Sequence, residues 1–206
     1  MNNKTAVGNL ESYYKIHAAI YDLTRWSFLY GRKKAINELK YFDMNPTEIL
    51  EIGCGTGVNL IELTKKFPQS QFTGIDLSAE MLDKADGKST IQKFEVELIL
   101  EDYLNFDSAK KYDIILFSYA LTMMGKYKSA ILEKAVYDRN TGGMITIVDF
   151  HSTQSNWFKK WMEFNHVEME GLIDENLLSS LKSEGLSIQK AYSGLWKYFV
   201  YWGRKI

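Results

Sequence analysis

A nine-residue stretch of the chain carries one acidic side chain and three closely spaced glycines. It reads Ile49-Leu-Glu-Ile-Gly-Cys-Gly-Thr-Gly57, an apolar run that contains Glu51 and leads into Gly53, Gly55 and Gly57. Apolar residues at helical spacing follow from position 58. A strand, a glycine turn and a helix in this order form nucleotide-type cofactor sites at the carboxyl end of a parallel strand. Glycine suits such a turn because no Cβ separates the backbone from the ligand.

The spacing of the glycines distinguishes two classes of cofactor. A dinucleotide fingerprint has the pattern G-x-G-x-x-G, but Val58 or Leu60 occupies the third glycine position in the two registers available here. Glu51 would oppose a diphosphate, whereas it suits a ligand that carries an ammonium and a sulfonium. A second predicted strand, 72–77, contains Asp76 near its end, and a carboxylate there can accept hydrogen bonds from both hydroxyls of a ribose. These features favour S-adenosylmethionine over NAD.

With these residues the chain resembles the class I S-adenosylmethionine-dependent methyltransferases. The resemblance covers roughly residues 45–150 in the order and spacing of that family. The matching segments are Glu51–Gly57, Gly74–Ser78 with Met81, Glu101–Tyr103, Tyr112–Ser118 and Gly142–Asp149. One glycine pattern alone would be weak evidence, but the ordered series is specific.

The resemblance implies a role for each matching position. The methionine part of the cofactor is expected over Gly53, Cys54, Gly55 and Gly57, with Glu51 near its ammonium. Asp76 is expected to hold the ribose, Leu77 to press on the adenine and Asp102 to accept from the adenine amino group. Further cofactor contacts are expected at Tyr14, Met81, Tyr103 and Ser118. Cys54 also suits a small filler, Asp102 a turn and Ser118 a plain strand end.

Alternating strand and helix patterns predict the elements that position these residues. Strands are expected near 48–52, 71–76, 96–100, 112–118, 144–149, 186–192 and 196–203. Helices are expected near 58–67, 78–86, 126–139, 155–169 and 174–184. This alternation predicts an α/β fold with a Rossmann-like, doubly wound sheet of seven strands. A turn at Ser193-Gly194 joins the last two strands, so the last strand is expected to be antiparallel.

Length and composition are typical of a single domain. The 206 residues, 46% of them hydrophobic, are expected to form one methyltransferase domain, with a helical cap over 1–45 and the α/β core over 46–206. The net charge of −1 indicates no nucleic-acid partner. The single cysteine, Cys54, fits a reducing compartment, and no cluster of side chains has metal-ligand spacing. No apolar run could span a membrane. A cytoplasmic enzyme is expected, either free or peripheral on the inner face of the membrane.

Two aromatic and basic stretches have two interpretations each. Residues 10–41 and 156–164 are amphipathic as helices, and each could either pack on the core or lie on an anionic bilayer. In the second stretch Trp157, Trp161 and Phe164 form one stripe, which lysines flank. Tryptophan beside lysine is typical of helices at membrane surfaces.

The segment Ala19–Arg32 narrows the resemblance to a lipid-modifying group. It is similar to bacterial phosphatidylethanolamine N-methyltransferases and to the enzymes that trimethylate the headgroup of betaine lipids. The similarity depends on Tyr21-Asp22, Arg25 and Tyr30-Gly31-Arg32. It implies that the acceptor is the amine headgroup of a membrane lipid. The alternatives are a soluble small-molecule N- or O-methyltransferase and a non-catalytic S-adenosylmethionine-binding module.

Methyl transfer to an amine needs few catalytic groups. The amine lone pair must lie in line with the sulfonium methyl, about 3 Å away, in a pocket that accepts positive charge. Aromatic faces stabilise such charge, and Tyr21 and Tyr119 are the candidates for this wall, with Tyr14 beside them. His151, just past the fifth predicted strand of the sheet, is the candidate proton acceptor, although an exposed loop histidine is an equally simple interpretation.

Overall fold

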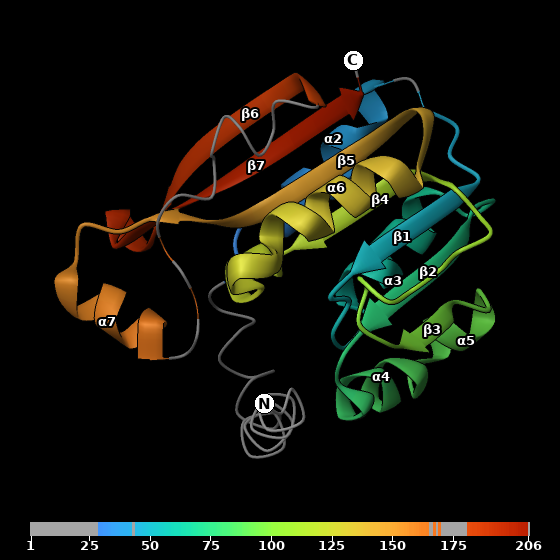
Figure 1. Ribbon diagram of the computed structural model, residues 1–206, viewed down its shortest axis with the longest axis horizontal. Coiled ribbons are helices and arrows are strands. Elements are labelled where there is room, and N and C mark those ends of the chain that lie inside the picture. The colour runs from blue at the N-terminus through green and yellow to red at the C-terminus, as the bar shows by residue number, and fades with distance from the viewer. Residues whose placement is uncertain (1–28, 43, 165–166, 168, 170–180, 206) are drawn as a thin grey trace.

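Short apolar runs build a central sheet in the computed structural model, which describes residues 29–42, 44–164, 167, 169 and 181–205 (Figure 1). The strands are β1 (Glu48–Ile52), β2 (Gln71–Asp76), β3 (Glu97–Leu100), β4 (Tyr112–Ser118), β5 (Arg139–Ser152), β6 (Leu181–Ala191) and β7 (Trp196–Lys205). Their order across the sheet is β3-β2-β1-β4-β5-β7-β6. The pairs from β3 to β5 are parallel, whereas β7 runs antiparallel to both β5 and β6. The predicted Rossmann-like sheet of seven strands with an antiparallel last strand is confirmed.

Helices cover both faces of this sheet (Figure 1). They are α2 (Arg32–Glu38), α3 (Val58–Lys66), α4 (Ala79–Asp86), α5 (Ser89–Lys93), α6 (Lys128–Asp138) and α7 (Asn156–Phe164). Short 3-10 segments are η1 (Leu39–Phe42), η2 (Leu121–Met123), η3 (Gly125–Tyr127) and η4 (Tyr192–Gly194). One core cluster holds side chains of α2, α3 and α7, and a second holds those of α6. Strand β4 contributes to both clusters, Ile114 and Leu116 to the first and Ile115 and Phe117 to the second, because alternate residues point to opposite faces.

Three element boundaries differ from the predicted ones. Residues 181–184 belong to β6 rather than to a helix over 174–184, because Leu181 pairs with Lys205 of β7; the rest of that predicted helix lies outside the described residues. Strand β5 begins at Arg139 instead of residue 144, with a register shift against β4. Helix α7 ends at Phe164, short of the predicted residue 169. Long-range strand pairing, which a local pattern does not contain, decides the first two boundaries.

The N-terminal part of the described chain packs against the sheet. Ala35 and Ile36 of α2 are buried, and the Ala35 carbonyl accepts a hydrogen bond from Trp202 Nε1 at 3.1 Å. Gly31 precedes α2 with a φ of 82°, and a Cβ there would lie 2.4 Å from the ring of Tyr198. Residues 29–42 therefore follow the core-packing interpretation, while residues 10–28 of the same stretch lie outside the described residues.

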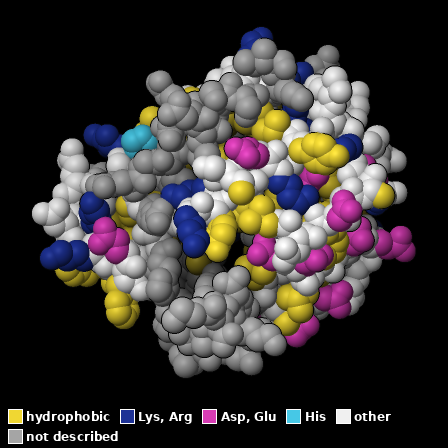
Figure 2. Space-filling model, in the orientation of Figure 1, with side chains coloured by type: hydrophobic (Ala, Val, Ile, Leu, Met, Phe, Trp, Pro, Cys, Tyr) yellow, Lys and Arg dark blue, Asp and Glu magenta, His cyan; other side chains and the backbone are white. Residues whose placement is uncertain are grey.

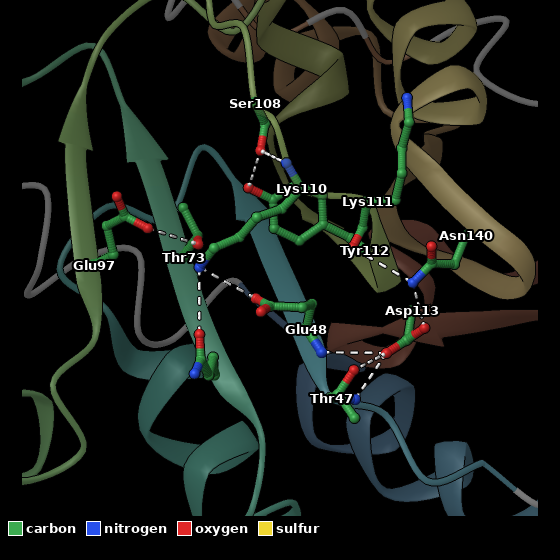
Figure 3. Close-up of polar contacts among 11 residues, drawn as sticks. Thr47, Glu48, Thr73, Glu97, Ser108, Lys110, Lys111, Tyr112, Asp113 and Asn140 are labelled. Carbon is green, nitrogen blue, oxygen red and sulfur yellow. Dashed lines mark hydrogen bonds and ion pairs between the residues drawn. The ribbon is translucent and has the colours of Figure 1, made fainter.

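A polar network fastens the amino edge of the sheet, opposite the predicted site (Figure 3). Asp113 of β4 accepts hydrogen bonds from the backbone N–H of Thr47 at 2.7 Å, from Thr47 Oγ1 at 2.9 Å and from Asn140 Nδ2 at 2.7 Å. Burial alone would raise the pKa of Asp113, but these hydrogen bonds and that from Glu48 N–H outweigh it and hold the pKa below its ordinary value. The starts of β1, β4 and β5 are thus held together.

Candidate active site

The glycine turn follows β1 at the carboxyl edge of the sheet. Gly53, Gly55 and Gly57 have φ angles of 72°, 53° and 71°, in the left-handed region that favours glycine. A Cβ at Gly55 would meet nothing within 4 Å, whereas one at Gly53 would lie 2.9 Å from the Cβ of Ala120. At Gly57 it would lie 3.2 Å from the Cβ of Ala85 in α4. Gly55 is therefore the glycine that borders open space, and its two neighbours allow the end of β4 and the helix α4 to approach the turn.

Asp76, at the end of β2, holds this turn in place. Its Oδ2 accepts a hydrogen bond from Gly55 N–H at 2.7 Å, and its Oδ1 accepts one from Ser78 N–H at 2.9 Å. A carboxylate has about four acceptor positions, so a carboxylate that orders a backbone turn can also accept hydrogen bonds from ribose hydroxyls. The carboxylate that the sequence assigns to the ribose thus also orders the glycine turn, a role that the sequence did not reveal.

Glu51 lies buried beneath the turn, on the face of the sheet that α3 covers. Asn59 of α3 donates a hydrogen bond from Nδ2 to Glu51 Oε1 at 2.7 Å. The second oxygen, Oε2, is buried and has no hydrogen-bond partner among the described residues. Burial raises the pKa of Glu51 to about 8, although the Asn59 hydrogen bond and the positive charge of Arg32 lower it. A buried carboxylate oxygen without a donor is suited to the ammonium of an incoming ligand.

Cys54 is a packing residue within the turn. Its side chain is buried, and its Sγ lies 2.9 Å from the position that a Cβ on Gly74 would take. Its backbone N–H donates to the Ile75 carbonyl at 3.1 Å. Burial, with Glu51 and Asp76 nearby, raises the pKa of the Cys54 thiol. The small-filler interpretation therefore describes its side chain, which links β1 to β2.

The ends of β2 and β3 bring the predicted adenine residues together. Leu77 is 61% exposed, so its side chain is available to an adenine ring. Glu101 N–H donates to the Asp76 carbonyl at 3.2 Å, which places the neighbouring Asp102 near the end of β2. Asp102 is exposed and accepts a hydrogen bond from Leu104 N–H through Oδ1 at 3.0 Å, so it forms the turn that was the alternative interpretation. Its second oxygen could still accept from a ligand.

Two residues assigned to the cofactor have structural roles instead. Tyr103 is buried in the second core cluster, and its hydroxyl donates to Asp138 Oδ2 of α6 at 2.8 Å. Met81 is buried at the start of α4. Its backbone N–H donates a hydrogen bond at 3.3 Å to Oγ of Ser78, which caps the helix. We therefore do not assign the side chains of Tyr103 and Met81 to the cofactor site. Sequence position alone could not show which way these two side chains point.

The end of β4 closes one side of the turn. Ser118 is buried next to the register pair of Ile52 and Phe117, and its Oγ has no hydrogen-bond partner among the described residues. Tyr119 has a φ of 55°, a buried ring, and a hydroxyl that donates to the Tyr30 carbonyl at 2.7 Å. Tyr119 thus holds the segment before α2 instead of exposing its hydroxyl. Tyr14 and Tyr21 lie outside the described residues.

The structure reveals an aromatic cluster that the sequence interpretation missed, consisting of Tyr30, Tyr192, Trp196 and Tyr198. Tyr30 contacts the other three, with ring centroids 5.4 Å from Tyr192, 6.3 Å from Trp196 and 6.2 Å from Tyr198. Because Lys197 of β7 pairs with Ser152 of β5, the cluster lies at the same edge as the glycine turn. Tyr30 and Tyr192 remain 42% and 46% exposed. The hairpin before β7 was predicted from the sequence. Its contact with Tyr30 could not be predicted, because the two segments are distant in the sequence and meet only in the folded protein.

His151 is half-buried near the end of β5. Its Nδ1 lies 2.8 Å from Ser152 Oγ. Burial and the nearby charge of Lys197 lower its pKa below the ordinary value for histidine, which keeps the ring neutral at pH 7. A neutral imidazole at this edge has a nitrogen, Nε2, with which it could accept a proton.

Comparison with known proteins agrees with this geometry. A family model described as a methyltransferase domain matches residues 44–197. Malonyl-(acyl-carrier protein) O-methyltransferase 1 of Ilyobacter polytropus is 35% identical over 88 residues, which are 43% of this chain and 28% of that protein. Carboxy-S-adenosyl-L-methionine synthase of Nautilia profundicola is 33% identical over 103 residues, 50% of this chain and 44% of that protein. The chain thus spans less than half the length of these curated relatives.

A solved structure extends the similarity to nearly the whole chain. The plantazolicin methyltransferase BpumL, in complex with a desmethyl-plantazolicin analogue and S-adenosylhomocysteine, superposes with a TM-score of 0.70 at 22% identity. The match covers 93% of this chain and 90% of that one. The chain belongs to the methyltransferase domain family, and its fold is that of the class I S-adenosylmethionine-dependent methyltransferases.

Proposed function

We propose that the enzyme N-methylates the amine headgroup of a membrane lipid such as phosphatidylethanolamine. The observation that carries this proposal is the aromatic cluster at the carboxyl edge, the edge that also carries the glycine turn. Tyrosine and tryptophan faces attract an ammonium, whereas they offer nothing specific to a carboxylate acceptor. The similarity of Tyr30-Gly31-Arg32 to lipid N-methyltransferases is consistent with this choice, since Tyr30 is the centre of the cluster.

In this proposal four side chains hold the cofactor. Glu51 Oε2 accepts from the ammonium of its methionine part, and Asp76 accepts from the ribose hydroxyls. Leu77 covers one face of the adenine, and Asp102 accepts from the adenine amino group through its second oxygen. When bound, S-adenosylmethionine supplies a methyl group on a positively charged sulfur. The open side of Gly55 lets the backbone lie against it.

The acceptor side must remove a proton and tolerate positive charge. An ammonium headgroup has to lose one proton before its nitrogen lone pair can attack, and the methylated product carries the positive charge again. The aromatic cluster stabilises the cation in both states, which favours repeated methylation of one headgroup. His151, held neutral at pH 7, is proposed to take the proton at Nε2, either directly or through a water molecule.

Residues 1–45 are proposed to cap the active site. Tyr119 already ties the end of β4 to Tyr30 in this segment. Tyr14 and Tyr21, which precede the described residues, are proposed to complete the wall around the acceptor. The α/β core over 46–206 and the cap would then form one domain.

The test is to incubate the protein with methyl-labelled S-adenosylmethionine and one of three acceptors. These are phosphatidylethanolamine vesicles, phosphatidylglycerol vesicles and soluble phosphoethanolamine. The proposal predicts that only phosphatidylethanolamine gains label, one methyl for each proton that is replaced. Label on phosphoethanolamine alone would overturn the lipid assignment in favour of a soluble amine acceptor. Label on none of them would overturn the N-methylation proposal.

A variant pair tests the aromatic cluster itself. Tyr192→Leu should lower the turnover of phosphatidylethanolamine at least about tenfold while S-adenosylhomocysteine binding stays unchanged. Tyr137→Leu, on α6 near the start of β5, is the matched control because Tyr137 is also exposed but lies at the opposite edge. Equal turnover in both variants would show that the cluster does not contact the acceptor.

A further inference from the structure

Helix α7 has two apolar faces, and only one of them is buried. Phe158 and Met162 face the core, where the ring of Phe158 stacks on that of Trp196 with centroids 5.0 Å apart. Trp157 and Phe164 are 70% and 79% exposed, and Trp161 is 40% exposed. At about 100° per residue, these three side chains form one stripe roughly a quarter-turn or more away from the buried face. The stripe is therefore not the part of α7 that holds the helix to the protein.

The turn between β6 and β7 continues this exposed stripe. Thr153, which precedes α7, donates a hydrogen bond from Oγ1 to the Leu195 carbonyl at 2.6 Å. Tyr192 and Leu195 of the turn are themselves exposed. The turn has an unusual backbone, with positive φ angles at Tyr192, Ser193 and Gly194. Two segments that are distant in the sequence thus form one apolar surface, which we call the α7 face: Trp157, Trp161, Phe164, Tyr192 and Leu195.

We propose that the α7 face docks the enzyme on an anionic phospholipid bilayer. The proposal extends the proposed function, and rests on it for its biological purpose, by naming the surface through which a lipid acceptor is reached. The face adjoins the aromatic cluster directly, because Tyr192 belongs to both and Phe158 packs on Trp196 beneath it. A bilayer against the α7 face would therefore present its headgroups at the acceptor side of the site.

The charges around the face match an anionic bilayer better than a protein partner. Helix α7 carries Lys159 and Lys160 against a single acid, Glu163, although the chain as a whole has a net charge of −1. Figure 2 shows hydrophobic and basic side chains gathered over α7. Tryptophan prefers the boundary between headgroups and acyl chains, and lysine adds attraction to anionic headgroups. Among the described residues, no helix has the length and hydropathy of a membrane span.

The test measures vesicle binding without any methyl transfer. Full-length protein is sedimented with vesicles of phosphatidylcholine and with vesicles that also contain phosphatidylglycerol, at low and at high salt. The proposal predicts binding to the mixed vesicles at low salt, weakened by high salt because the lysine contribution is screened. Absence of binding to the mixed vesicles at low salt would overturn it.

Two variants locate the contact. Trp157→Ser combined with Phe164→Ser should lower the vesicle partition coefficient at least about tenfold, because both side chains would otherwise leave water. Tyr137→Ser, which removes a side chain that is 75% exposed at the opposite edge of the sheet, should change nothing. Unchanged binding in the double variant would overturn the proposal, provided that its unfolding midpoint and S-adenosylhomocysteine affinity match those of the unchanged protein.

A charge reversal gives a second, independent readout. Lys160→Glu should weaken binding to the anionic vesicles several-fold, while Lys182→Glu at the start of β6 serves as the control. Equal effects of the two reversals would contradict docking through α7. Vesicle binding that depends on α7, without methylation of phosphatidylethanolamine, would retain the docking face and reject the headgroup assignment. Methylation of detergent-dispersed phosphatidylethanolamine without vesicle binding would retain the headgroup assignment and reject the docking face.

Discussion

Two carboxylates lie beside the glycine turn in different environments, and this difference determines what each can do. Asp76 accepts hydrogen bonds from two backbone N–H groups, which stabilise its charge. Glu51 is fully buried, and its Oε2 has no hydrogen-bond partner among the described residues, so its charged form is costly until a cation arrives. Asp76 is thus charged in the free protein and orders the turn. Glu51 becomes charged when a cationic ligand binds.

Cofactor binding should therefore depend on pH through Glu51. With a pKa of about 8 in the free protein, Glu51 is mostly protonated at pH 6 and must lose its proton to pair with an ammonium. Affinity for S-adenosylhomocysteine should rise by up to about tenfold per pH unit between pH 6 and 8 and then level off. Calorimetry across this range measures the effect, and Glu51→Gln should remove most of the slope. The same slope in both proteins would contradict the role given to Glu51.

The folding stability should carry the opposite pH dependence. A Glu whose pKa rises from 4.5 in the unfolded chain to about 8 in the folded one binds its proton more tightly when folded. The free energy of unfolding of the ligand-free protein should therefore fall as pH rises between these two values. Denaturation curves at pH 6 and pH 8 measure this change. The free energy of unfolding should fall less between these pH values in Glu51→Gln than in the unchanged protein. A larger loss in the variant would show that Glu51 is not the group responsible.

Asp76→Ala should weaken cofactor binding by about 1–3 kcal/mol, because ribose hydroxyls lose an ionised partner and Gly55 N–H loses its acceptor. The matched control is Asp113→Ala at the amino edge, which also removes a carboxylate that accepts backbone N–H groups but lies away from the turn. It should leave the affinity unchanged. Calorimetry with S-adenosylhomocysteine compares the two, and equal losses would point to general destabilisation.

At the residue scale the sequence predicted identities better than orientations. The acid before the glycines, the acid after β2 and the exposed leucine beside it could be located because their spacing is local. The orientation of Tyr103 toward Asp138 and of Tyr119 toward Tyr30 depends on residues 35 and 89 positions away, so no local pattern contains it. The same holds for Tyr192, because its ring contacts that of Tyr30, which is distant in the sequence.

At the scale of elements, the turn before α2 determines how the N-terminal segment meets the sheet. Gly31 combines a left-handed backbone with a close approach to Tyr198 of β7. Further along the segment, Trp202 donates a hydrogen bond to the Ala35 carbonyl and Arg204 donates one to the Phe42 carbonyl. We call this line of contacts between residues 31–42 and β7 the seam. This seam positions Tyr30, and with it the aromatic cluster.

Gly31→Ala should destabilise the protein by roughly 1–3 kcal/mol, since it combines an unfavourable φ with a collision against the Tyr198 ring. Gly87→Ala is the matched control, because Gly87 has a φ of −63° and a Cβ there would lie 3.6 Å from the nearest atom. That change should be neutral or slightly stabilising. Urea denaturation measures both, and similar midpoints for the two variants would mean that the seam tolerates the added methyl group.

Asp113→Ala tests the network at the other edge. It should lower the free energy of unfolding at pH 7 by about 1–3 kcal/mol, because the backbone N–H groups of Thr47 and Glu48 and the Asn140 amide lose their acceptor. Since the folded-state pKa of Asp113 is depressed, its contribution is present above its unfolded pKa of 3.8 and is lost as pH falls through the folded value. The difference in free energy of unfolding between Asp113→Ala and the unchanged protein should therefore become smaller as the pH falls. A constant gap would indicate that the carboxylate charge is irrelevant.

The order of elements was predictable, and the two strand boundaries that failed depend on long-range pairing. Each strand from β1 to β4 is a short apolar run between helical patterns, so its position could be inferred from periodicity. Strand β6 extends beyond its apolar core because it pairs with β7 over a long antiparallel register, and β5 begins early because Arg139 pairs with Tyr112 of β4. An exposed edge strand such as β6, whose side chains are mostly solvated, lacks the pattern that marks a strand.

At the scale of the whole molecule, the two edges of the sheet have different roles. The amino edge is closed by the hydrogen bonds of Asp113, while the carboxyl edge carries the glycine turn, the aromatic cluster and the α7 face. We therefore propose that binding and chemistry take place at the ends of the parallel strands, where such folds place their ligands. The sequence predicts this polarity, and the family match to residues 44–197 supports the methyltransferase fold that it assumes.

The most direct measurement is a crystal structure of the protein with S-adenosylhomocysteine bound. It should place the ammonium within hydrogen-bond distance of Glu51 Oε2, the ribose hydroxyls on Asp76, and the sulfur facing the aromatic cluster across Gly55. A ligand whose ammonium is held elsewhere while Glu51 Oε2 stays without a donor, or whose sulfur points away from Tyr30 and Tyr192, would contradict the assignment of this edge as the site of methyl transfer.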